Sequence, residues 1–69
     1  MKIFITGLDI DYKDCALEMG GRIVAEEDSI NVQFPSTVEM YTDGNNVGFT
    51  SPIVGIVISR FEFVRIEIV

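Results

Sequence analysis

The chain has 69 residues, a formal net charge of −6, one cysteine and no histidine, and 48% of its residues are hydrophobic. This length predicts a single compact domain over residues 1–69, the hydrophobic content argues against disorder, and the charged residues within the longest apolar run argue against a membrane helix. Because histidine is the commonest general base and metal ligand, its absence disfavours an enzyme, and we expect no catalytic residue, no cofactor and no metal site.

The N-terminal third is predicted to form a strand and a short helix. Residues 2–6 read K-I-F-I-T, which is typical of a central strand with apolar residues on both faces. Asp11 is the expected N-cap of a helix over about residues 11–19, and Gly20 supplies the left-handed residue that ends it. The apolar positions of this helix are Tyr12, Cys15, Ala16 and Met19. Since this spacing places them on one side, the helix is expected to pack on a sheet.

The middle of the chain is predicted to be a series of strands. Residues 22–25 form the first, and residues 30–34 alternate apolar with polar side chains, as a strand with one buried face does. Strands over residues 37–42 and 47–51 follow. The sequence D-G-N-N between them predicts a hairpin turn, because glycine and asparagine tolerate positive φ.

The C-terminal run, residues 52–69, is rich in β-branched and aromatic residues and is therefore predicted to be strand. Within this run the parity of the apolar residues inverts. Val57, Phe61 and Phe63 are odd and the charged residues among them are even, whereas Val64, Ile66 and Ile68 are even and alternate with odd charged residues. We therefore expect a β-bulge or break near Phe63-Val64. The first part is predicted to lie in the sheet, with Phe61 and Phe63 under the helix. The second part turns its opposite face inward and is predicted to contact another strand or another chain.

These elements predict an α+β fold with one short helix on a twisted, mainly antiparallel sheet of five to seven strands. Two arrangements of the first two strands are open. They can be parallel neighbours joined by a right-handed crossover, or a third strand can lie between them.

The negative charge is concentrated in residues 9–28, where acidic residues outnumber basic ones and give a net charge of −5. The acidic residues of this segment are Asp9, Asp11, Asp14, Glu18, Glu26, Glu27 and Asp28. Such a surface repels a phosphate backbone and attracts a basic protein surface. We therefore expect no direct binding of nucleic acid and propose these residues as a surface that binds a basic protein.

Two chemical alternatives in this segment are weaker. The aspartates around residues 9–14 could hold a divalent cation, but the glycine and distal glutamate of an EF-hand loop are missing, so helix capping explains them better. Cys15 could be a nucleophile at a helix N-terminus, but it lies in the apolar stripe and there is no histidine to activate it. A lone cysteine and the lack of a signal-peptide pattern predict a cytoplasmic protein.

The sequence thus favours a small acidic protein-binding module, an inhibitor that docks on a basic, nucleic-acid-binding protein by charge mimicry. Its size and acidity are similar in kind to those of virus-encoded inhibitors of host defence proteins. The alternative is a structural protein that self-associates into a homodimer or larger homo-oligomer, because one short helix cannot cover both apolar faces of the C-terminal run. The residues proposed for this self-association are Val64, Ile66 and Ile68.

Overall fold

The computed structural model describes residues 2–69, which form seven strands, one α-helix and two 3₁₀ turns. The first half contains β1 (Ile3–Asp9), η1 (Ile10–Tyr12), α1 (Lys13–Glu18), β2 (Arg22–Glu26) and β3 (Ser29–Phe34). The second half contains β4 (Glu39–Asp43), β5 (Asn46–Thr50), β6 (Gly55–Ser59), η2 (Arg60–Glu62) and β7 (Arg65–Ile68). No helix within residues 2–69 has the length and hydrophobicity that crossing a bilayer requires.

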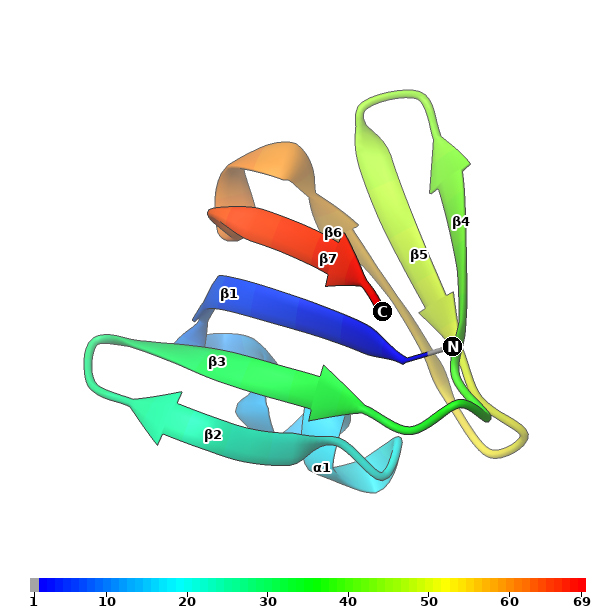
Figure 1. The fold of residues 1–69 in the computed structure, drawn as a ribbon. Coiled ribbons are helices and arrows are strands. Elements are labelled where there is room, and N and C mark those ends of the chain that lie inside the picture. Colours follow the sequence, from blue (N-terminus) through cyan, green and yellow to red (C-terminus); the bar gives the residue numbers. More distant parts are fainter. Residues whose placement is uncertain (1) are drawn as a thin grey trace.

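The strands form two antiparallel sheets, one of four strands in the order β2-β3-β1-β7 and one of three in the order β4-β5-β6 (Figure 1). The predicted α+β class, with one short helix and mainly antiparallel strands, is confirmed. Of the two arrangements for the first strands, the split one is present, because β3 pairs with both β1 and β2 and lies between them.

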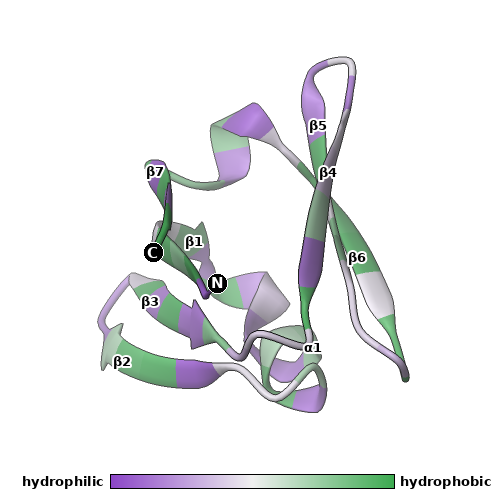
Figure 2. Ribbon diagram, turned by 45° about the vertical axis from the view of Figure 1, so that its right-hand side comes forward, coloured by the Kyte–Doolittle hydropathy of each residue, from purple (hydrophilic) through white to green (hydrophobic). Residues whose placement is uncertain are grey.

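The core lies between the four-stranded sheet, the helix and the three-stranded sheet, which stands as a separate layer in Figure 2. The helix contributes Ala16, and its C-cap residue contributes Met19, both buried. Phe34 of β3 and Phe49 of β5 stack with ring centroids 5.6 Å apart, which joins the two sheets directly. The two-residue turn at Gly44, with φ +61°, forms the predicted hairpin between β4 and β5.

The N-cap of the helical segment lies two residues before the expected one. Asp9, not Asp11, is the capping residue, since its side chain accepts a hydrogen bond of 3.0 Å from the backbone N–H of Asp11. Asp11 therefore lies inside η1, and the helical turns run from Ile10 to Glu18. Gly20, with φ +84°, ends the segment as expected.

The prediction that Phe61 lies under the helix is wrong, since its side chain is 94% exposed, whereas Phe63 is half-buried against the core. Strand β6 ends at Ser59, and residues 60–62 form the 3₁₀ turn η2. Ser59 and Glu62 make a capping box. The side chain of Ser59 accepts a hydrogen bond from the backbone N–H of Phe61, and the side chain of Glu62 accepts one from the backbone N–H of Ser59. Strand β6 directs its even positions inward, since Ile58 is buried and Val57 is 49% exposed, so the odd face that parity assigned to the core is the outer face.

The predicted break near Phe63-Val64 is present, because neither residue belongs to a strand and β7 starts at Arg65. Beyond the break, β7 turns back and pairs antiparallel with β1. Ile66 of β7 lies opposite Ile5, which is fully buried, and packs against the core. The second part of the C-terminal run therefore completes the four-stranded sheet of its own chain.

Candidate protein-binding surface

Carboxylates gather at the end of the molecule where β1 finishes and the β2–β3 hairpin turns. Asp9 is the last residue of β1 and pairs with Ser29, which places it next to the hairpin turn at Asp28. Glu26 closes β2, and Glu27 follows in the turn. Residues separated by almost twenty positions in the sequence thus share one end of the sheet.

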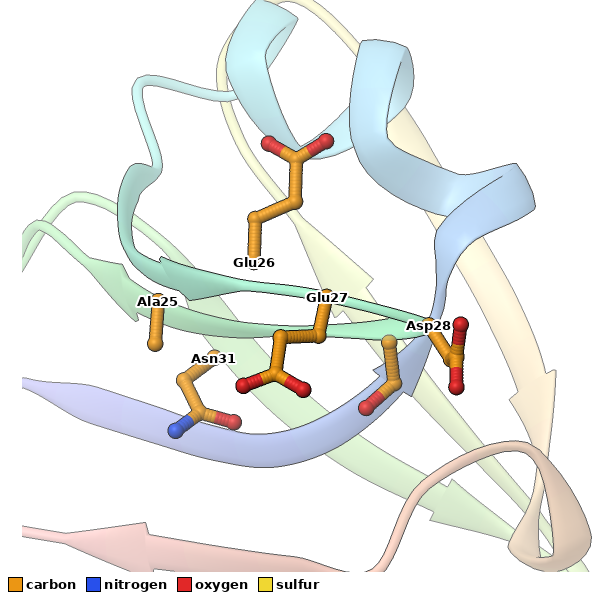
Figure 3. A pocket seen from close by; sticks show the side chains of 6 residues that line it. Ala25, Glu26, Glu27, Asp28 and Asn31 are labelled. Atoms are coloured by element: carbon orange, nitrogen blue, oxygen red, sulfur yellow. The ribbon is translucent and has the colours of Figure 1, made fainter.

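The side chains of the hairpin point to both sides of the sheet (Figure 3). Glu26 points toward the helical segment, where its Oε1 forms an ion pair of 2.8 Å with Nζ of Lys13. Glu27 and Asn31 point to the opposite side. Because both partners of the ion pair are exposed, it contributes little to stability, but it partly compensates the charge of Glu26.

Of the remaining acidic residues of the predicted surface, Asp11 stays at this end, because its backbone N–H donates to the side chain of Asp9, whereas Glu18 lies away from it. Asp14 and Glu18 are exposed on α1. The helix leads from Lys13, beside the hairpin turn, to Gly20, where the nearest contact for an added Cβ would be Pro35 at 3.4 Å. Since Pro35 follows the far end of β3, Glu18 lies toward the opposite end of the sheet.

Glu62 of η2 joins the acidic end although it lies outside the acidic segment. Its Oε2 accepts a hydrogen bond of 2.7 Å from Oη of Tyr12, and its Oε1 accepts one of 2.9 Å from the backbone N–H of Ser59. The bond to Glu62, followed by burial and by the nearby carboxylates, raises the pKa of Tyr12 to about 12. The bond from Tyr12 joins η2 to the helical segment, and the bond from Ser59 closes the turn itself.

Phe61 and Val64 stand on this end as exposed apolar side chains, 94% and 77% accessible. Together with Asp9, Asp28 and Glu62 they line one shallow hollow in the surface. One side of Val64 packs against Gly7, since its Cγ2 would lie only 2.5 Å from a Cβ added to that glycine. We call these five residues the acidic–aromatic surface: Asp9, Asp28, Phe61, Glu62 and Val64.

Sequence reasoning missed Phe61 and Glu62 as members of this surface. The signal that identifies them is the sequence S-R-F-E at residues 59–62, which matches the serine-x-x-glutamate pattern of a capping box. A capping box predicts a helical turn there in place of a continuous strand. In such a turn the second and third residues point outward, as Phe61 does.

The other proposed sites take ordinary structural positions. Cys15 is half-buried, and burial, followed by the charge of Glu18, raises the pKa of its thiol, which disfavours the reactive thiolate. Among residues 2–69 no three metal-ligating side chains come together. Of the residues proposed for self-association, Ile66 packs on the core, while Val64 and Ile68 are exposed.

Comparison of the chain with protein-family models, with curated proteins and with solved structures finds no match.

Proposed function

We propose that this protein is an acidic binding module that docks on a basic protein surface through the acidic–aromatic surface, and that it inhibits a nucleic-acid-binding partner by occupying the site of the phosphate backbone. The observation that carries the proposal is an exposed phenylalanine on a hydrogen-bonded turn, surrounded by carboxylates. The protein acts by binding, without catalysis.

The exposed phenylalanine and the carboxylates around it support binding for two physical reasons. The capping box fixes the backbone that carries Phe61, so the side chain is presented at a defined place, and aromatic residues supply much of the binding energy at interfaces. The carboxylates around it attract basic residues over a distance and accelerate association. A partner that normally binds phosphates presents arginine and lysine, whose charge is opposite to that of the carboxylates in the acidic–aromatic surface.

The proposal is tested with two variants and two controls, each immobilised and exposed to an extract of the source cell. Phe61→Ser removes the aromatic contact. Asp9→Asn combined with Asp28→Asn removes two charges, while asparagine still caps the helical segment. Ile53→Ser is the control for Phe61, because Ile53 is 84% exposed at a loop outside the acidic–aromatic surface. Glu39→Gln combined with Asp43→Asn is the control for charge, since both residues belong to β4.

We expect the immobilised wild type and both controls to capture a basic protein from the extract. Both test variants should fail to capture it. With that partner purified, Phe61→Ser should weaken affinity by at least about 2 kcal/mol, roughly thirtyfold, as for a residue central to an interface. Association should also slow as salt rises from about 0.1 to about 1 M, where the Debye length falls from about 10 to about 3 Å. Equal retention by all variants, or a partner whose association ignores salt, would contradict the proposal.

A further inference from the structure

Strand β7 leaves one backbone edge of the four-stranded sheet open within residues 2–69, since it is the last strand in the order and pairs with β1 alone (Figure 1). Val69 and Lys2 exchange two backbone hydrogen bonds, of 2.7 and 2.9 Å, next to the end of this pairing. In an antiparallel ladder the alternate residues point the other way, so Ile66 and Ile68 direct their N–H and C=O groups to the open edge. Such an edge is a template for another strand.

The side chains along β7 are complementary to those of a second β7 that runs in the opposite direction. Residues 64–68 read V-R-I-E-I, so apolar residues lie symmetrically about Ile66 while Arg65 and Glu67, on either side of it, carry opposite charges. Arg65 lies opposite Thr6 and Glu67 opposite Phe4, which places both charged side chains on the outer face of the sheet. Their side chains are 65% and 46% exposed and form an ion pair of 2.9 Å within the chain.

We propose that a second copy of this chain pairs with β7 in antiparallel orientation about a two-fold axis at Ile66, which joins two four-stranded sheets into one of eight strands. Ile66 then lies opposite Ile66 of the second copy and exchanges hydrogen bonds with it. Arg65 lies opposite Glu67 of the second copy, and Glu67 opposite its Arg65. These charged pairs occupy the non-hydrogen-bonded positions, where side chains of paired strands come closest.

The charges select this register over its neighbours. The hydrogen-bonding groups match only if outward-pointing residues face each other, so the strands can slip by two residues but not by one. A slip in one direction places Arg65 opposite Arg65 of the second copy, and a slip in the other direction places Glu67 opposite Glu67. Like charges directly opposite are destabilising, so only the register centred on Ile66 is favourable.

Burial of apolar side chains also favours the register centred on Ile66. Val64 is 77% and Ile68 49% exposed in the single chain, and in this register Ile68 comes opposite Val64 of the second copy. The ladder of a strand this short gives a small interface, so we expect a weak dimer that forms at high protein concentration. Val64 belongs to both surfaces, but the inference does not rest on the proposed function, because Arg65 and Glu67, which select the register, lie outside the acidic–aromatic surface.

The test is sedimentation equilibrium of the full chain and three variants at concentrations up to about 1 mM, where a Kd of about 1 mM is still visible. Arg65→Glu and Glu67→Arg each turn both cross-strand pairs into like-charge pairs and should weaken the dimer by at least about tenfold. Mixing these two variants restores opposite charges across the interface, as does the double variant Arg65→Glu with Glu67→Arg. Both should dimerise like the wild type.

Arg22→Glu and Glu39→Arg are the matched controls, because they make the same changes of net charge on β2 and β4. Both should dimerise like the wild type, and circular dichroism should show that every variant is folded. Slowed hydrogen exchange at the amides of Ile66 and Ile68 in the concentrated wild type would support the register. A monomeric wild type, single variants that dimerise normally, or a mixture that stays monomeric would overturn the proposal.

Discussion

At the residue scale, Glu62 connects the turn η2, which carries Phe61, with the helical segment that follows β1. One of its oxygens accepts from Ser59 within η2, and the other accepts from Tyr12 in the helical segment, fifty positions away in the sequence. A carboxylate that accepts two hydrogen bonds holds both donors in place more strongly than neutral acceptors would. The backbone position of Phe61 therefore depends on the hydrogen bonds of its neighbour Glu62.

The hydrogen bond to Glu62 predicts a pH dependence at alkaline pH. The pKa of Tyr12 is about 12 in the folded chain and about 10 when unfolded, so the folded state binds the phenolic proton more tightly. This stabilisation is complete below pH 10 and is lost as pH rises toward 12. Urea unfolding at several pH values should show that decline in the wild type and a smaller one in Tyr12→Phe. Equal declines would contradict the assignment.

At the element scale, a β-bulge in β1 places Val64. Two residues of β1, Thr6 and Gly7, oppose the single residue Asn31 between the paired positions, and Gly7 has φ +71°. The side chain of Asn31 compensates for the interrupted ladder by accepting a hydrogen bond of 3.0 Å from the N–H of Gly7. Gly7 has no side chain at the point where Val64 packs, so the segment after the break can lie close to the backbone of β1.

We expect Gly7→Ala to destabilise the fold by about 1–3 kcal/mol, because alanine at positive φ is strained and its Cβ would lie 2.5 Å from Cγ2 of Val64. Gly44→Ala is the control for backbone strain alone, since φ is +61° there and no atom lies within 4 Å of an added Cβ. Chemical denaturation should show a larger loss for Gly7→Ala. Val64→Ala in the same chain should recover part of the difference, and equal losses at both glycines would exclude the proposed contact.

At the scale of the whole molecule, two sheets share one core. Phe49 of the three-stranded sheet is fully buried against Phe34 of the four-stranded sheet, and neither sheet has an apolar layer large enough to be stable alone. We infer that the two sheets unfold together as one cooperative unit, as small single domains usually do.

Phe49→Ala tests this cooperativity and should cost about 3–5 kcal/mol, a large part of the total stability of a small domain. Phe4→Ala is the control of the same chemistry, because Phe4 is only half-buried on the outer face of the four-stranded sheet. Hydrogen exchange should accelerate in β1 and β3 as much as in β4 and β5 when Phe49 is truncated. Acceleration confined to β4–β6 would show that the sheets unfold separately.

Much of the local structure could be predicted because it depends on neighbouring residues. Helical spacing identified the helix, alternation identified β3, and the reversed parity after Phe63 identified the break. The N-cap was displaced to Asp9 because several aspartates compete for the free N–H groups, and spacing alone does not choose among them. Phe61 was misplaced because parity separates two faces without showing which one is buried, and the inner face of β6 is the even one, with Ile58.

By itself the sequence determined the α+β class, the order of the elements, the excess of negative charge and the interruption before Val64, since each depends on composition or on contacts between near neighbours. Only the tertiary structure decided that the strands divide into two sheets, that β3 separates β1 from β2, and that Glu62 and Phe61 join the acidic end. Those outcomes depend on pairing between distant segments. Many pairings satisfy the same local pattern, and the packing of the shared core selects one of them.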